Sequence, residues 1–166
     1  GTGKGIDARS RVSSPAQLHA VCSDLLERFR QAVLVEEYLP GREFTVGLLG
    51  TGRRARVLGT LEVGVAENAP SVDYGFEMKE RCEEFCVYQA AAPGPLRDEV
   101  ESVALAAYLA LECRDAGRVD VRLDAAGRAS FMEVNPLAGL NPGHSDLPMI
   151  ATQQGLSFPA LIAAIL

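Results

Sequence analysis

Apolar side chains recur at helical spacing early in the chain, between residues 18 and 29. Just before them, Ser14 can cap a helix, Pro15 suits the first turn, and Gln17 completes a capping box. The pattern therefore predicts a helix over residues 14–29.

Three further helices are predicted in the second half of the chain. From Leu96 to about residue 111, one apolar face runs through Val100, Val103, Ala104, Ala107 and Leu111. Two short apolar stretches, 146–154 and 156–166, predict C-terminal helices that Gly155 separates.

Several segments between the predicted helices have the pattern of strands. AVLVEEYL (32–39), EFTVGLLG (43–50), RVLGTLEV (56–63) and FCVYQA (85–90) each predict a strand. The second and third should form a hairpin around residues 51 and 52, because Thr-Gly separates them.

The segment RVDVRLD (118–124) alternates strictly between apolar and charged residues. One side of the predicted strand carries Val119, Val121 and Leu123. The other side carries Arg118, Asp120, Arg122 and Asp124. After the turn AAG, ASFMEVN (129–135) predicts the return strand. Helices and strands mix without regular βαβ units, which predicts an α+β fold.

If AAG closes a tight hairpin, Asp120 lies nearly opposite Glu133, and Asn135 shares the face of Glu133. Gly127 could add a bulge and shift this register by one residue. Two carboxylates so close together repel each other, and a divalent cation removes the conflict. The side chains of Asp120, Glu133 and Asn135 would all offer oxygen ligands. Mg²⁺ prefers oxygen, whereas zinc usually takes His or Cys ligands.

The alternative is a solvated polar face on which Arg118 and Arg122 neutralise the acids. The segment after Asn135 favours the metal site. It is a loop rich in Pro and Gly, which is more typical of a binding loop than of a spacer.

Composition excludes several classes of function. The 166 residues carry a net charge of −6, without a cluster of Lys and Arg, which disfavours binding to nucleic acid or to an anionic membrane. No apolar run reaches the length of a membrane span, and the first residues lack the apolar core of a signal peptide. The four cysteines lack the usual zinc spacing, and a reducing, cytoplasmic setting is expected.

Several segments, in this order, resemble the ATP-grasp superfamily and, within it, the D-alanine–D-alanine ligases. They are VLVEEYLPGREFTVGLLG (33–50), GRVDVRLD (117–124), FMEVNPLAG (131–139) and HSDLP (144–148), with GTGKGI (1–6) in front. The resemblance implies one ATP-grasp domain over 1–166, with antiparallel sheets and flanking helices. Two lobes, roughly 1–63 and 85–166, would enclose a nucleotide cleft.

The chain opens directly on the glycine-rich segment GTGKGI, whereas such loops normally follow a strand. We therefore expect the C-terminal portion of a longer ligase. The resemblance implies that ATP phosphorylates a carboxylate and that an amine then attacks the acyl phosphate to form an amide. The substrates would be amino acids or dipeptides, and a homodimer and a part in cell-wall biogenesis are left open.

The resemblance assigns the metal ligands to Asp120, Glu133 and Asn135, which would hold Mg²⁺ or Mn²⁺. It makes Arg118 the group that stabilises the phosphorylated intermediate, since its donors can straddle phosphoryl oxygens. Lys79 matches the lysine that contacts the nucleotide phosphates.

GTGKGI resembles the mobile loop that closes over the phosphates, and Lys4 would add a positive charge there. For the base and sugar of ATP, the resemblance points to one segment. Glu36 would accept from the adenine amino group, the backbone of Glu37 and Leu39 would complete the purine contact, and Tyr38 would pack beside the ring. Glu43 matches the ribose-binding glutamate. As strand residues, both Glu36 and Glu43 could instead be ordinary surface residues.

The resemblance places the second amino acid near the loop after Asn135. Ser145 would receive its carboxylate and also fits the N-cap of the following helix. Gly139 would offer a backbone N–H to the intermediate, while His144 has no assigned role. Asp146 departs from the family, which usually has an apolar residue there, and should change the preferred amine.

The sequence leaves two other hypotheses about function open. The chain could be a non-catalytic nucleotide-binding module or inactive fragment, because the family places its first-substrate residues further upstream. It could also be an ATP-grasp kinase or carboxylase-type enzyme without an amide product.

Overall fold

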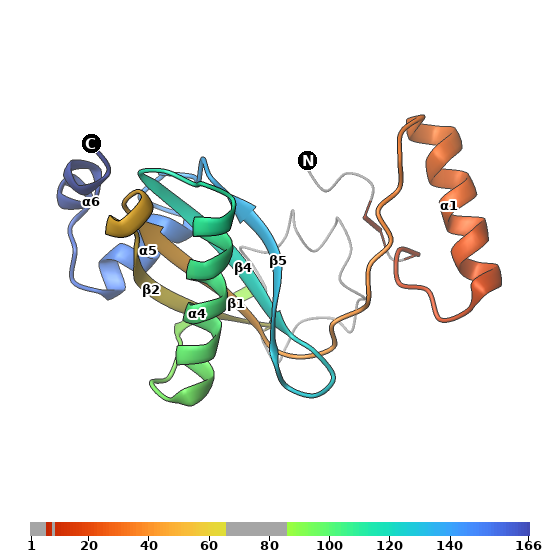
Figure 1. Cartoon of the computed structure of the whole chain (residues 1–166), viewed down its shortest axis with the longest axis horizontal. Coiled ribbons are helices and arrows are strands. Elements are labelled where there is room, and N and C mark those ends of the chain that lie inside the picture. The colour runs from red at the N-terminus through yellow and green to blue at the C-terminus, as the bar shows by residue number, and fades with distance from the viewer. Residues whose placement is uncertain (1–5, 8, 66–85) are drawn as a thin grey trace. The chain divides into compact units, whose positions relative to one another are not determined.

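The computed structural model describes residues 6, 7, 9–65 and 86–166 (Figure 1). The chain divides into two contact units, Gly1–Tyr38 with Val65–Cys86, and Leu39–Gly64 with Val87–Leu166. The expected lobes, 1–63 and 85–166, stay a prediction. Among the described residues, no helix is both long enough and apolar enough to cross a bilayer.

In the first unit, the predicted helix is confirmed as α1, Pro15–Phe29. The hydroxyl of Ser14 accepts a hydrogen bond from the backbone N–H of Gln17 at 3.3 Å. Gln17 reaches back to the backbone N–H of Ser13, at 2.9 Å, rather than to that of Ser14. Both contacts satisfy N–H groups around the start of the helix that no helical turn can satisfy.

The predicted strand at 32–39 is wrong, because the chain there has no strand structure. Leu34 is 79% exposed and Val35 is 57% exposed. A β-rich composition only shows that a segment fits a pleated, half-buried surface. The strand itself needs a hydrogen-bonded neighbour, and composition does not supply one.

The second unit is built on a five-stranded sheet with the order β3-β2-β1-β4-β5. Its strands are β1 Glu43–Leu49, β2 Arg56–Val65, β3 Cys86–Ala90, β4 Ala116–Leu123 and β5 Ala129–Asn135. β1 pairs antiparallel with both β2 and β4, and β4 pairs antiparallel with β5. The predicted hairpin is confirmed, with the short 3-10 helix η1, Gly52–Arg54, between β1 and β2.

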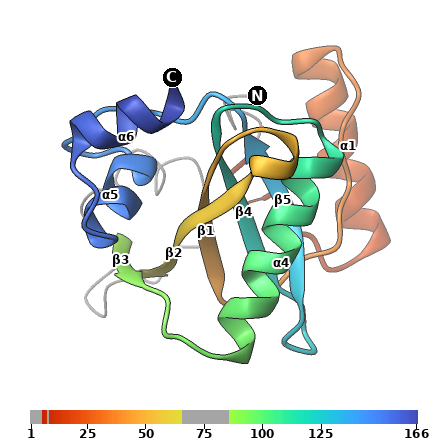
Figure 2. The same ribbon diagram turned by 60° about the vertical axis from the view of Figure 1, so that its left-hand side comes forward.

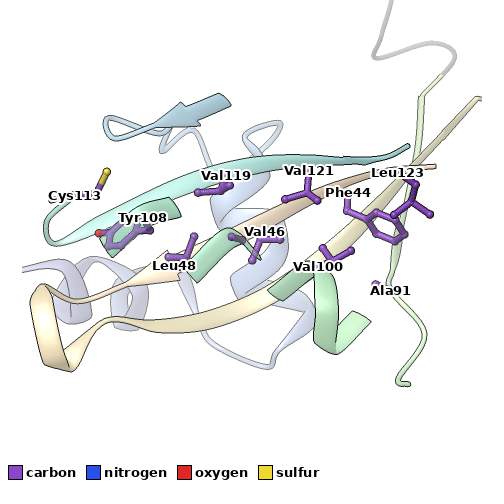
Figure 3. Packing of buried hydrophobic residues seen from close by; sticks show 11 residues of the cluster. Phe44, Val46, Leu48, Ala91, Val100, Tyr108, Cys113, Val119, Val121 and Leu123 are labelled. Carbon is purple, nitrogen blue, oxygen red and sulfur yellow. The ribbon is translucent and has the colours of Figure 1, made fainter. Parts of the chain in front are cut away.

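Helix α4, Pro95–Ala110, covers one face of this sheet (Figure 2). The alternation in β4 is confirmed, since every second residue from Gly117 to Leu123 is buried. The core between helix and sheet, most of it shown in Figure 3, contains Phe44, Val46, Leu48, Ala91, Val100, Ala104, Tyr108, Cys113, Val119, Val121 and Leu123.

The predicted face of α4 is partly corrected. Val100 and Ala104 are buried as expected, but Leu111 is 54% exposed because the helix ends at Ala110. Tyr108, and not Leu111, occupies the end of the core. Its ring is fully buried, and its hydroxyl donates to the carbonyl of Gly50 at 3.1 Å.

The predicted C-terminal helices are confirmed as α5, Asp146–Gln153, and α6, Phe158–Ile165, with Gly155 between them at φ +74°. Buried Leu49 of β1 shares a second hydrophobic cluster with Leu147, Ala151 and Leu161 of these helices. Side chains alternate along β1, so this cluster lies on the face opposite to Leu48 and α4.

Helix α5 approaches the sheet closely because two paired strand residues lack side chains. Gly47 of β1 pairs with Gly59 of β2. A Cβ atom on Gly47 would lie 3.0 Å from Leu147 Cδ1, and one on Gly59 would lie 2.9 Å from Ile150 Cγ2. The helix thus packs directly on bare backbone.

Candidate active site

The face of the sheet that carries α5 is polar beyond the helix. In β1 and β4, the residues that alternate with the buried apolar ones point to this side. The β1–β4 pairing sets Thr45 opposite Asp120 and Glu43 opposite Arg122. The hydroxyl of Thr45 donates to Asp120 Oδ1 at 3.0 Å.

The β4–β5 hairpin brings the three predicted metal ligands together. Asp120 pairs with Glu133 and Arg118 pairs with Asn135, so the expected register is confirmed. The amide of Asn135 donates to Glu133 Oε1 at 3.4 Å. The hairpin contains a bulge, which lies between Asp120 and Val121 in the pairing and not at Gly127.

Arg118 lies at the centre of this polar cluster. Its Nη2 donates to Asp120 Oδ2 at 2.8 Å and is 3.9 Å from Glu133 Oε1. Its Nη1 donates to Asp146, at the start of α5. Its Nε is buried and has no acceptor among the described residues.

Burial and charge act in opposite directions on these groups. Desolvation by burial raises the pKa of Asp120, although the nearby Arg118 and the hydrogen bonds from Arg118 and Thr45 act to lower it. Desolvation acts to lower the pKa of Arg118, but attraction to Asp120 and Asp146 prevails and raises it. Arg118 therefore stays charged, whereas burial disfavours the charged form of Asp120.

The donor set fits a hard divalent cation. Three carboxylates surround one guanidinium, so the cluster carries a net charge of −2 when all four groups are ionised. The side chain of Glu133 is 60% exposed, whereas that of Asp120 is 13% exposed and held by Arg118 and Thr45. In the described part of the chain, no three residues among His, Cys, Asp and Glu form a metal-binding group. The amide of Asn135 and a ligand's own oxygens would have to complete the coordination.

The alternative of a neutralised polar face is also visible in the structure. Arg118 pairs with Asp120, and Arg122 lies 3.5 Å from Glu43 Oε2. These pairs do not cancel the charge around Arg118, where acids outnumber the arginine. The geometry is therefore compatible with a cation.

The residues predicted to bind the nucleotide do not all belong to the contact unit that contains the sheet. Glu43 lies on the polar face, beside Arg122. Glu36, Glu37 and Tyr38 belong to the other contact unit, whereas Leu39 begins the unit of the sheet. The guanidinium of Arg11 lies 4.1 Å from the centre of the Tyr38 ring. Lys4 and Lys79 lie outside the described residues.

The loop after β5 is organised around Ser145. Ser145 is the N-cap of α5, as expected, but its side chain makes no capping hydrogen bond. Its hydroxyl instead accepts from the backbone N–H of Asn141 at 3.1 Å. A Cβ atom on Gly139 would lie only 2.7 Å from this hydroxyl. Gly139 and Ser145 are thus brought together, while His144 is an exposed loop residue.

For two residues of the polar cluster, the contacts with the other members were not predicted from the sequence. Thr45 sits in an unremarkable strand pattern, and only its pairing across to Asp120 gives it a role. Asp146 stood out as an unusual charge, but its bond to Arg118 spans 28 residues. The charge itself was the only available signal.

Comparison with known proteins identifies the family of the chain. The family model described as "D-ala D-ala ligase C-terminus" matches residues 5–166. The D-alanine--D-alanine ligase of Bordetella avium is 35% identical over 156 residues, which cover 89% of this chain and 47% of that protein. The ligase of Bordetella pertussis is 39% identical over 146 residues, covering 86% and 44%. The chain therefore spans about half the length of these relatives.

Solved structures show the same fold. A D-alanine--D-alanine ligase from Bacillus anthracis, complexed with ATP, has a TM-score of 0.72 at 24% identity, covering 93% of this chain and 46% of that one. The VanG D-Ala:D-Ser ligase from Enterococcus faecalis has a TM-score of 0.67 at 22% identity, covering 92% and 43%. The fold is that of the ATP-grasp proteins. With a family model that matches almost every residue, the chain belongs to the D-alanine–D-alanine ligase C-terminal family.

Proposed function

We propose that this chain is the ATP- and metal-binding part of a cytoplasmic ligase that joins a carboxylate to an amine. The substrates are small amino acids or dipeptides. One observation carries the proposal: Arg118, Asp120, Glu133 and Asn135 gather on one face of two neighbouring strands. Family membership supports it independently.

In this proposal, Asp120, Glu133 and Asn135 hold Mg²⁺. The fixed carboxylate of Asp120 anchors the ion, and the exposed side chain of Glu133 can adjust to it. When bound, ATP and Mg²⁺ supply the phosphoryl group that activates the carboxylate and the charge that makes its transfer easier. Arg118 contributes fixed positive charge beside the ion, where it stabilises negative charge on the transferred group.

The nucleotide contacts follow the family positions. Glu43 binds the ribose from the same face of the sheet as Asp120. Glu36, the backbone of Glu37 and Leu39, and Tyr38 bind the adenine.

The phosphates are bound by the two lysines Lys4 and Lys79. The acceptor amino acid is bound through its carboxylate by Ser145 at the start of α5, where helix N–H groups favour an anion. Gly139 offers its backbone N–H beside Ser145.

The test is ADP release by the full-length protein, given ATP, Mg²⁺ and single or paired amino acids. ADP release that requires an amine, together with an amide product, supports the ligase. ADP release without an amine would instead identify a kinase-type activity. Nucleotide binding without ADP release would identify a binding module and contradict the ligase proposal.

A further inference from the structure

The polar cluster contains a contact that the proposed reaction does not require. Arg118 is held at both ends of its guanidinium, by Asp120 through Nη2 and by Asp146 through Nη1. Asp120 lies two residues away on the same strand, whereas Asp146 belongs to helix α5. The guanidinium is planar and delocalised, so two carboxylates at its two ends fix both its position and its plane.

Burial makes this arrangement stronger than an ordinary surface ion pair. The side chains of Arg118, Asp120 and Asp146 are 25%, 13% and 15% exposed. By contrast, Arg9 and Asp7 form a pair whose side chains are 60% and 42% exposed. Pairs of the exposed kind contribute little because water and salt screen them, whereas partly buried pairs are screened much less.

Helix α5 holds Asp146 firmly in place. The two residues that follow it, Leu147 and Pro148, are buried, and so is Ile150. Leu147 and Ile150 pack over Gly47 of β1, the residue that pairs with Arg118. The carboxylate of Asp146 is therefore fixed by a helix that rests on the same sheet as the arginine.

Arg118 keeps donors for a ligand in this arrangement. A guanidinium has five N–H donors, and the hydrogen bonds to Asp120 and Asp146 engage one on each Nη. The Nε is buried without an acceptor among the residues that the structure describes. The two acids thus orient the group without saturating it.

We propose that Asp146 is a positioning residue, which holds Arg118 in the orientation in which it meets the transferred phosphoryl group. The inference rests on the proposed function, in which Arg118 stabilises that group. Through Asp146, the arginine is tied to the start of α5, and thus to Ser145, the N-cap of that helix.

A simpler role for Asp146 would be that of an acidic residue near a helix N-terminus, where it interacts favourably with the helix dipole. Asp98 provides the matched control, because it lies in the first turn of α4 and outside the polar cluster. Replacing either acid by Asn removes a charge from a first helical turn, but only the change at Asp146 removes a partner of Arg118.

The experiment uses the full-length protein and the amine-dependent release of ADP. Asp146→Asn should lower kcat on the order of 10- to 100-fold, as expected for a misplaced catalytic group. KM for ATP should change little, because the lost contact acts on the transferred group and not on the nucleotide as a whole. Asp146→Glu, which keeps the carboxylate, should recover part of the rate, and Asp98→Asn should leave kcat unchanged.

A double-mutant cycle then shows whether Asp146 acts through Arg118. In an Arg118→Lys background, Asp146→Asn should cause almost no further loss of kcat. The midpoint of thermal unfolding without nucleotide is then measured for the same four proteins. The shift of this midpoint in the double variant should differ from the sum of the shifts in the two single variants. Additive effects in both measurements would overturn the inference, and so would an unchanged kcat in Asp146→Asn.

The two proposals fail in different ways. If the unaltered protein released no ADP with any amine, the ligase proposal would fall and take the catalytic role of Asp146 with it. The unfolding cycle would then still show whether the two side chains are coupled. If the ligase is active and Asp146→Asn retains full kcat, only the positioning role is overturned.

Discussion

Single residues set the shape of the loop between β5 and α5, residues 136–145. The hydroxyl of Ser145 accepts from Asn141, and the backbone N–H of Ser145 donates to the carbonyl of the same residue at 3.0 Å. Gly139 lies so close to this hydroxyl that no side chain fits between them. The loop therefore presents Ser145 in one position, and a methyl group at residue 139 should move it.

Gly139→Ala tests this arrangement. Its Cβ would lie 2.7 Å from Ser145 Oγ, which forces the hydroxyl or the loop to shift. We expect KM for the acceptor amino acid to rise about tenfold or more, since specific hydrogen bonds to a charged group contribute about 1.5–3 kcal/mol. Steady-state kinetics with varied acceptor measure the effect. The control is Gly143→Ala, whose Cβ would meet only Asn141 Oδ1 at an ordinary 3.4 Å. Equal KM values in the two variants would contradict the prediction.

Glu133→Gln tests the metal site at the same scale. The substitution keeps the size and one oxygen of the side chain but removes its negative charge. Because the side chain is 60% exposed, the fold should stay intact. Affinity for Mg·ATP should fall on the order of 10- to 100-fold, as is typical when a metal site loses a supporting group.

Calorimetric titration of Glu133→Gln with Mg·ATP measures this loss, and circular dichroism checks the fold. Glu112→Gln, an exposed residue just after α4, serves as the control. An affinity equal to that of the control would argue against Glu133 as a ligand.

At the scale of elements, the sheet carries different chemistry on its two faces. Helix α4 seals one face with an apolar core, and α5 covers only part of the other. The polar residues gather beside α5, so the approach of this helix to β1 and β2 decides where Asp146 stands. That approach depends on the glycine pair Gly47 and Gly59.

Gly59→Ala should therefore destabilise the protein. Its Cβ would lie 2.9 Å from Ile150 Cγ2, and Ile150 is buried and cannot move aside freely. Overpacking of this kind costs about 1–3 kcal/mol, which exceeds the small entropic gain of replacing glycine. Urea unfolding measures the change. Gly64→Ala in the same strand, with its nearest contact at 3.6 Å, should be neutral or slightly stabilising. Equal stability of the two variants would show that α5 can shift away from the sheet at little cost in free energy.

At the scale of the whole molecule, stability at high pH should depend on Tyr108. Burial raises the pKa of Tyr108 to about 12, with smaller contributions from Cys113 and Asp115. The folded protein thus favours the neutral phenol, and the unfolded chain ionises near the ordinary value of 10.0. The stabilisation is complete below pH 10 and is lost as pH rises towards 12, by roughly 2–3 kcal/mol.

Tyr108→Phe isolates this effect. At pH 9 the variant should be less stable by about 1 kcal/mol, because the hydrogen bond to Gly50 is lost. As pH rises past 10, the difference from the unaltered protein should shrink and then reverse, since phenylalanine does not ionise. Urea unfolding at several pH values measures it. A constant difference between pH 9 and 12 would mean that Tyr108 ionises equally in both states.

The sequence predicts those parts of the molecule that depend on neighbours along the chain. The alternation in β4 and its tight turn to β5 are local, so the closeness of Asp120 and Glu133 follows from them, although the bulge at Met132 sets the pair itself. Thr45 and Asp146 join the cluster only through contacts across 75 and 28 residues, which no local pattern reports. The failed strand at 32–39 has the same origin, because a strand requires a distant partner.

The bulge at Met132 in β5 determines which environment Glu133 and Asn135 meet. Val121 pairs with Phe131 while Asp120 pairs with Glu133, so Met132 is skipped in the ladder. Side chains alternate with a period of two, and skipping one residue therefore reverses the parity of everything that follows. If Met132 were instead paired in a regular ladder, Glu133 and Asn135 would share the side of Phe131 and face the apolar core under α4. Deletion of Met132 would therefore remove the bulge but keep the same pairs, so Glu133 and Asn135 would stay on the wet side.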